Sequence, residues 1–323
     1  MLTIHEVTGT RLTKRRSLDE IESAPYWIDL LHPTADEDLA VETALGIEVP
    51  TRAEMREIEA SNRLYFEQGA YVMTALVAHN IEGGTPQFSA VTFILHGQNL
   101  VTVRYAEPRA FPLFLSRVEK GDAPCNDGAA ILVGLLESLV QRKADLIEHI
   151  QDEVNRLATQ VFGIKGGQQS RTKRLDVALR TIGRLGETTS RAEESTNSLD
   201  RLLLFLIQAM KQRKDDAQDV QRIKTVQRDI RSLTEHLHFL SERITFLLDA
   251  VLGMISIEQN QIIKLFSVMA VMLMPPTLVA SIYGMNFRNM PELEWVFGYP
   301  YALLLMLVAA IVPYLYFRKK GWL

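Results

Sequence analysis

The sequence predicts an α+β domain followed by long helices that continue into a two-helix transmembrane domain. Residues 1–126 mix short strand-like runs with helix signals. Residues 127–261 contain no proline and place apolar residues at helical spacing. The remaining residues are mostly apolar, so the mean hydropathy of +0.02 averages two unlike parts of the chain.

The first 126 residues are expected to form a mixed domain of strands and short helices. Thr34 and Glu37 have the spacing of a capping box at the start of a helix, and Pro50 precedes a second short helix. Runs rich in Val, Ile, Thr and aromatic residues predict the strands. These runs are residues 2–7, 26–30, 62–80, 88–96 and 99–105.

Residues 127–261 are expected to form a long-helix stalk. Apolar stripes predict helices over 127–162, 171–211 and from 215 onward. The third pattern has no proline before Pro275, so one helix is expected from Asp215 to Tyr283, on the order of 100 Å long. Such a helix could carry a conformational signal into the membrane. A coiled-coil tether would give the same pattern.

Two apolar segments have the length of membrane spans. Residues 262–285 and 299–317 each approach the ~20 residues that cross a bilayer, and residues 286–298 form a short loop between them. Pro275 and Pro276 lie inside the first span, where neighbouring helices can satisfy the carbonyls that they leave free. A buried helical hairpin of a soluble protein is disfavoured because aromatic residues flank the second span at both ends.

The flanking charges predict the orientation of the chain. Lys264 opens the first span, and a basic cytoplasmic tail at 318–323 closes the second. The positive-inside rule then places both termini in the cytoplasm of a multi-pass inner-membrane protein. The first twenty residues show no long apolar run that would indicate secretion, and the single cysteine, Cys125, suits a reducing compartment.

Two motifs lie between the spans, Gly284-Met285-Asn286 and Met290-Pro291-Glu292-Leu293. In this context the chain resembles the CorA family of magnesium channels over its whole architecture. The resemblance implies a homopentamer, funnel-like, that admits Mg²⁺ down its electrochemical gradient, with Co²⁺ and Ni²⁺ as further ions. It also implies that cytoplasmic Mg²⁺ closes the channel, so that Mg²⁺ is both the transported and the regulatory ion.

The motif Gly284, Met285 and Asn286 is the expected selectivity filter. Mg²⁺ sheds its water reluctantly, so a ring of Asn286 amide oxygens could bind the hydrated ion and still release it. Gly284 would let the chain turn out of the helix. Outside this context, Asn286 would be taken as a helix C-cap residue.

One face of the first span is the expected pore lining. It is polar at both ends and apolar between them, so the apolar part could gate by dewetting. The resemblance assigns Asn260, Met274 and Thr277 to the pore, and helix packing is the alternative for the apolar members. The full row is Asn260, Ile263, Phe266, Ala270, Met274, Thr277 and Ser281.

Acidic residues are the candidates for regulation and cation attraction. Asp249 matches a regulatory acid of the family, and Asp215 and Asp219 are further candidates, although a solvated helix start also explains them. Glu292 and Glu294 in the outer loop could concentrate cations by their field.

Other classes of function find little support. The sequence has no nucleotide-binding loop and no arrangement of catalytic residues, so neither an enzyme nor a nucleotide-binding protein is expected. The net charge of −4 disfavours nucleic acid as a partner. The expected partners are the lipid bilayer, divalent cations and further copies of the chain. A zinc transporter of the related ZntB branch and a membrane-tethered sensor remain the alternatives.

Overall fold

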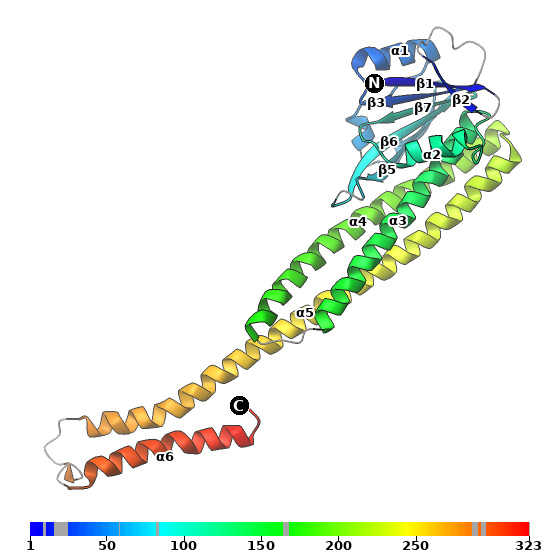
Figure 1. Ribbon diagram of the computed structural model, residues 1–323. Coiled ribbons are helices and arrows are strands. Elements are labelled where there is room, and N and C mark those ends of the chain that lie inside the picture. The colour runs from blue at the N-terminus through cyan, green and yellow to red at the C-terminus, as the bar shows by residue number, and fades with distance from the viewer. Residues whose placement is uncertain are drawn as a thin grey trace. The chain divides into compact units, whose positions relative to one another are not determined.

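The structure is a computed structural model that describes residues 1–8, 11–15, 25–57, 59–81, 84–163, 168–285, 290–291 and 295–322. The chain divides into two compact units (Figure 1). Unit 1 comprises residues 1–163 and 178–247, and unit 2 comprises residues 164–177 and 248–323.

Unit 1 contains a mixed sheet of seven strands within the described residues, in the order β2-β1-β3-β7-β6-β5-β4. The central pair β3 and β7 is parallel, and the other neighbouring pairs are antiparallel. The strands are β1 (Leu2–Thr8), β2 (Arg11–Arg15), β3 (Tyr26–Leu31), β4 (Leu64–Glu67), β5 (Ala70–His79), β6 (Gln87–His96) and β7 (Asn99–Arg104).

Both faces of the sheet are covered, because successive side chains of a strand point to opposite faces. Ile28 packs on one face with residues of α1 (Ala35–Leu45) and the short helix η1 (Glu54–Arg56). Its neighbour Trp27 packs on the other face with residues of the long helices and of α2 (Ala110–Glu119). Figure 1 shows α1 and α2 on opposite sides of the sheet.

Three long helices continue the second layer of unit 1. They are α3 (Gly128–Phe162), α4 (Gln168–Arg213) and α5 (Ala217–Tyr283). The prediction of three long helices, the last unbroken to Tyr283, is confirmed. Ion pairs and hydrogen bonds join them along their length, including His236 to Gln151 at 2.6 Å and Arg184 to Glu153 at 2.9 Å.

The start of α3 is held tightly against the sheet. Asp127 accepts a hydrogen bond from the backbone nitrogen of Ala130 and so caps the helix. A Cβ atom at Gly128 would lie 2.6 Å from the backbone carbon of Asn99, at the start of β7. Only glycine allows this approach, and it fixes the helix layer on the sheet.

The structure corrects the predicted strands in two places. The run 62–80 is not one strand, because Gln68 and Gly69 both adopt positive φ, at 48° and 79°, and form the turn of the β4–β5 hairpin. Strand β2 and helix α2 were absent from the predicted elements. The capping box at Thr34 and Glu37 is confirmed, and Glu37 also binds the amino group of Met1 at 2.8 Å.

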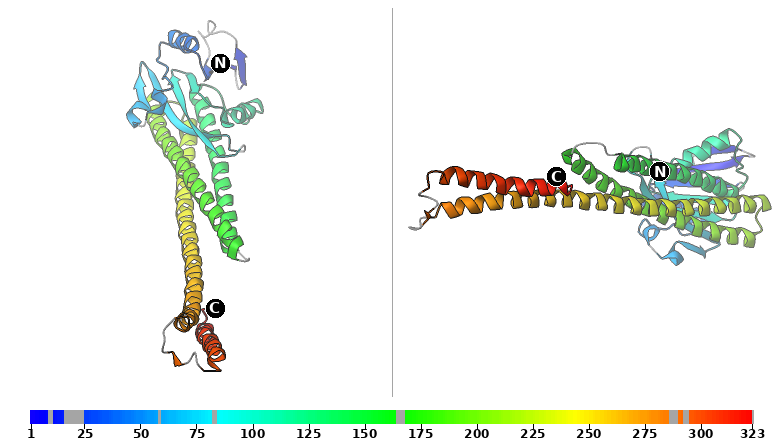
Figure 2. Two further views of the ribbon diagram at one scale, coloured as in Figure 1. Left: turned by 90° about the vertical axis from the view of Figure 1, so that its left-hand side faces the viewer. Right: turned by 90° about the horizontal axis from the view of Figure 1, so that it is seen from below.

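Unit 2 contains the C-terminal part of α5 and the helix α6 (Gly298–Lys319). Figures 1 and 2 show α6 running back beside the end of α5. Lys264 of α5 lies 5.9 Å from the ring of Trp322, just beyond α6. The two helices are therefore antiparallel neighbours.

A lysine is buried where α3, α4 and the sheet of unit 1 meet. Lys143 is 2% exposed, and its Nζ donates to Ser195 Oγ at 2.6 Å. Ser195 in turn donates to the carbonyl of Leu76 in β5 at 2.6 Å. No carboxylate pairs with Lys143 among the described residues, and burial lowers its pKa to about 7.

Replacing Lys143 with Met is expected to stabilise unit 1 at and below pH 7, because a charged buried amine is then removed. Between about pH 7 and 10.5 the unfolded chain binds a proton that the folded chain does not. Wild-type stability should therefore rise with pH relative to the variant, by at most about 1.4 kcal/mol per pH unit. Thermal unfolding in detergent from pH 6 to 9.5 measures the difference.

The exposed Lys224 of α5 provides the matched control. The difference in unfolding free energy between Lys224→Met and the wild type should not change as pH rises. The difference in stability between Lys143→Met and the wild type could instead stay constant with pH. That result would contradict the claim that charging the buried Lys143 amine destabilises the folded protein.

Candidate functional site

The predicted pore residues form a single stripe on α5. At about 100° per residue, their seven positions fall within an arc of about 120° around the helix axis. Val268, which is 1% exposed, lies on the opposite side, together with the partly covered Met272 and Val279. The covered positions of this segment therefore lie on the side away from the stripe, and the stripe itself is uncovered.

The stripe is exposed along its whole length in the single chain. Its large apolar members are among the most exposed of the protein, at 61% for Ile263, 64% for Phe266 and 69% for Met274. Asn260 at one end and Ser281 at the other are exposed polar residues. An apolar surface of this kind requires a partner other than water.

The two prolines lie within the helix without ending it. Pro275 and Pro276 have no N–H group, so the carbonyls of Val271 and Met272 lose their helical donors. Immediately after them, the hydroxyl of Thr277 donates to the carbonyl of Leu273 at 2.7 Å. In this rotamer the Thr277 hydroxyl has a local partner and can still accept a hydrogen bond from water.

Helix α5 ends at the predicted filter. The Gly284 nitrogen donates to the Ala280 carbonyl at 3.0 Å, and Met285 donates to Ile282 at 3.2 Å. Gly284 follows the last helical residue and does not adopt positive φ. A Cβ atom would lie 3.1 Å from the Ala280 carbonyl oxygen, closer than an ordinary contact. Asn286, Glu292 and Glu294 lie outside the described residues.

Aromatic residues gather at both ends of α6. The ring of Trp295 lies 5.9 Å from that of Tyr301 at the start of the helix. At the other end, Phe317 stacks on Trp322 at 5.4 Å, and Lys320 lies 5.4 Å from the Tyr316 ring. Amphipathic rings and a basic residue at helix ends are typical of membrane–water interfaces.

Asp249 lies on the same side of α5 as the stripe, three turns before Asn260. Its side chain is exposed and has no ion pair within the described part of the chain. The described residues of the single chain hold no cluster of three or more metal-binding side chains. A metal site at Asp249 would therefore need ligands from another copy.

Asp215 and Asp219 are placed differently. Asp215 pairs with Arg213 at 3.1 Å, and Asp219 pairs with Arg222 at 2.7 Å. Burial raises the pKa of both carboxyl groups, and the neighbouring guanidinium groups oppose that shift. Both carboxylates are already neutralised in the single chain, so they are weaker candidates for a metal than Asp249.

Both α5 and α6 are long and apolar enough to cross a membrane, and only 6% of the most apolar window of each is buried. A core helix of a soluble protein would be mostly covered. The α5 and α6 helices are therefore two candidate membrane spans of a chain that also carries the sheet of unit 1.

Comparisons with known proteins identify the family. The family model described as CorA-like Mg²⁺ transporter protein matches residues 22–319. The chain is 36% identical over 328 aligned positions to the magnesium transport protein CorA of Escherichia coli K12, with 100% of both chains covered. The chain belongs to the CorA-like Mg²⁺ transporter family.

Solved structures agree on the fold. The complete CorA magnesium transporter of Methanocaldococcus jannaschii matches with a TM-score of 0.79 at 18% identity, covering 100% of this chain and 99% of that one. The cytoplasmic domain of ZntB from Vibrio parahaemolyticus matches with a TM-score of 0.57 at 11% identity, covering 78% of this chain and 96% of that one. The predicted fold class of mixed domain, long helices and two-helix unit is confirmed.

Cysteine substitution can test whether the stripe faces water. Cys125 is fully buried and burial raises its pKa, so it provides little background reactivity. Ser281→Cys should react with a charged, membrane-impermeant thiol reagent at least about tenfold faster than Val279→Cys, because thiolate reactivity needs water and access. Val279 lies two residues away on the partly covered side of the helix. Equal rates, measured by mass shift, would contradict the assignment.

Proposed function

We propose that the chain forms a homo-oligomeric channel that admits Mg²⁺ across the inner membrane, with both termini in the cytoplasm. The observation that carries the proposal is the full-length 36% identity to a magnesium transport protein. The uncovered stripe on α5 supports the proposal. It occupies the part of α5 that follows the stalk residues and directly precedes the Gly284-Met285-Asn286 motif. The proposed role is transport of an ion and not catalysis.

The geometry of α5 explains why several copies are needed. Among the described residues the chain supplies two helices of membrane length, too few to enclose a path for ions. With α6 on one side of α5, copies placed around an axis can turn their stripes inward. Symmetry of this kind is the common solution for homo-oligomers, and the family resemblance implies five copies.

The stripe then lines an ion path that has polar surface at its ends and apolar surface in its middle. Asn260, Thr277 and Ser281 offer oxygen atoms that can exchange hydrogen bonds with the water shell of a cation. Phe266 and Met274 lie between the polar ends and form an apolar constriction that can exclude water when the copies approach. The path is therefore wet at its ends and gated in its middle.

A neutral amide filter suits Mg²⁺. The ion gives up its inner waters slowly, so it is bound best by oxygen atoms that accept hydrogen bonds from those waters. Asn286 supplies such an oxygen in each copy. Inward movement of a divalent ion gains about 4.6 kcal/mol per 100 mV, from ~2.3 per charge, so no nucleotide hydrolysis is required.

Asn286→Ala is the first test of the filter. Proteoliposomes with an inside-negative potential should take up Mg²⁺ with the wild-type protein, and the variant should lose at least about tenfold of that flux because binding of the hydrated ion is lost. Asn197→Ala, at an exposed asparagine of α4, should keep wild-type flux. Uptake is followed with an internal Mg²⁺ indicator, with Co²⁺ and Zn²⁺ as competitors.

Three outcomes separate the alternatives. Zn²⁺ flux without Mg²⁺ flux would move the chain to the zinc branch. No flux of any ion in the wild type would favour a membrane-tethered sensor. Full Mg²⁺ flux in Asn286→Ala would support Mg²⁺ transport by the chain but would contradict the role of Asn286 as the selectivity filter.

Asp249→Asn tests regulation by cytoplasmic Mg²⁺. If the exposed Asp249 carboxylate binds the regulatory ion between copies, its loss should raise the Mg²⁺ concentration that closes the channel by about tenfold, because the site loses one of its charged ligands and binds Mg²⁺ more weakly. The measurement is flux against Mg²⁺ on the cytoplasmic side.

Asp229→Asn, at another exposed aspartate of α5, is the control. Its closing concentration should match that of the wild type. An Asp249→Asn channel that closes at the wild-type concentration would remove Asp249 from the regulatory site.

A further inference from the structure

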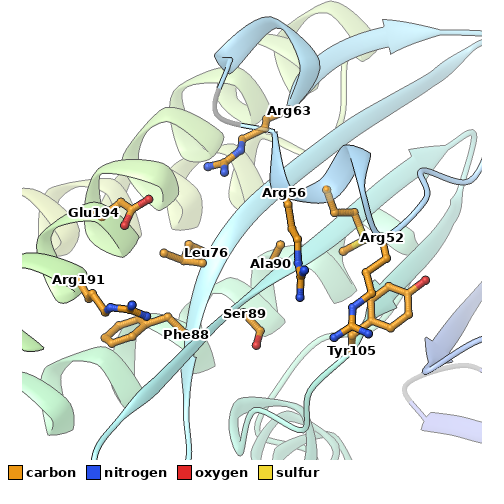
Figure 3. A pocket seen from close by; sticks show the side chains of 11 residues that line it. Arg52, Arg56, Arg63, Leu76, Phe88, Ser89, Ala90, Tyr105, Arg191 and Glu194 are labelled. Carbon is orange, nitrogen blue, oxygen red and sulfur yellow. The ribbon is translucent and has the colours of Figure 1, made fainter.

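A second candidate site lies in unit 1, away from the stripe. A cavity of about 350 Å³ opens between η1, the strands β5 and β6, and α4. Figure 3 shows charged side chains around it from several elements. The charged residues that line it are Arg52, Arg56, Arg63, Arg191 and Glu194.

The cavity has the opposite sign of charge from the chain. Four guanidinium groups against one carboxylate leave three positive charges on the lining, one of them partly offset by Glu187 beside Arg191, whereas the whole chain carries −4. Met55, Leu76 and Ala90 form apolar parts of the wall. Low-dielectric walls focus the field of the charges that they surround, so the cavity attracts anions.

The arginines retain free donors. Arg56 has no side-chain hydrogen bond or ion pair in the described part of the chain. The guanidinium of Arg52 lies 5.0 Å from the Tyr105 ring centre, and Arg63 donates through Nε to the carbonyl of Glu57. Arg191 reaches Glu187 at 3.5 Å, with both side chains more than half exposed. Each guanidinium therefore has donors left for a ligand.

A larger recess adjoins the cavity. It measures about 600 Å³ and shares Arg52, Phe88, Ser89, Tyr105 and Arg191 with the first. Figure 3 shows the Ser89 hydroxyl between the Phe88 and Tyr105 rings, and the Arg191 guanidinium beside Phe88. Both volumes lie in the range of roughly 300–1,000 Å³ that is typical of small-molecule sites.

We propose that this cavity binds a small anion that carries two or more linked phosphate groups. Arginine presents paired N–H donors that match the oxygens of a phosphate in a bidentate way. Three excess positive charges favour a di- or triphosphate over a single carboxylate. The Phe88 and Tyr105 rings offer apolar faces that could also hold a base.

No sequence motif indicates this site, because its residues lie far apart in the chain. Arg52 precedes η1, Arg56 is its last residue and Arg63 directly precedes β4. Arg191 comes from the middle of α4. The expectation that no nucleotide binds rested on the absence of a phosphate-binding loop, a feature of enzymes that hydrolyse nucleotides. The cavity needs no such loop, because side chains and not backbone N–H groups supply the donors.

The test is binding to the full-length protein in detergent. Isothermal titration in chelator-containing buffer would use sodium tripolyphosphate and ATP as probes. The double variant Arg56→Gln/Arg191→Gln should bind tripolyphosphate at least about tenfold more weakly than the wild type, because charge-assisted hydrogen bonds are lost. Both residues are exposed, so the fold should persist, and thermal unfolding checks this.

Arg201→Gln/Arg228→Gln removes the same charge from exposed positions of α4 and α5 and should bind like the wild type. Equal affinity for the two probes supports a free polyphosphate, and tighter ATP binding supports a nucleotide. Equal binding to the pocket variant and the wild type overturns the proposal, as does no binding at millimolar probe. A changed oligomeric state of the pocket variant with no binding also overturns it and makes the arginines a contact between copies.

Discussion

The exposed apolar surface of α5 and α6 is the constraint that the rest of the structure has to satisfy. Apolar surface in water costs about 25 cal/mol per Å², and Phe266 and Met274 are each about two-thirds exposed. Lipid can cover faces that offer only apolar groups. It cannot satisfy Asn260 or Ser281 at the ends of the stripe. In the proposed channel, helix α5 therefore has three surroundings, with α6 on one side, lipid beside it, and further copies enclosing water at the stripe.

The continuity of α5 links this surface to the sheet domain. Ile223, Val226 and Ile230 are buried in the core of unit 1, and the stripe belongs to the same 67-residue helix. An unbroken ladder of backbone hydrogen bonds makes a helix resist local bending. The prolines at 275 and 276 weaken it only near the end. In the proposed channel, α5 is the continuous element through which a change of packing in unit 1 would reach the stripe, and Asp249 belongs to the same helix.

The sequence predicted the features that repeat or are local. Periodicity predicted the long helices, and the spacing of Thr34 and Glu37 predicted a cap that the structure contains. It missed the hairpin turn at Gln68 and Gly69, because Gln is not a usual residue at positive φ. It missed the buried Lys143 because one lysine in a helical pattern looks solvated until its neighbours in α4 and β5 are known.

The two candidate sites differ in how the chain encodes them, and their charges keep them separate. The proposed ion path lies within one continuous stretch, so its residues could be named from the sequence. The arginine cavity is assembled from η1, the sheet and α4, and only the folded unit brings its charges together. An excess of three positive charges repels Mg²⁺. The cavity therefore disfavours cations, whereas the proposed ion path is lined by neutral oxygen atoms and apolar groups.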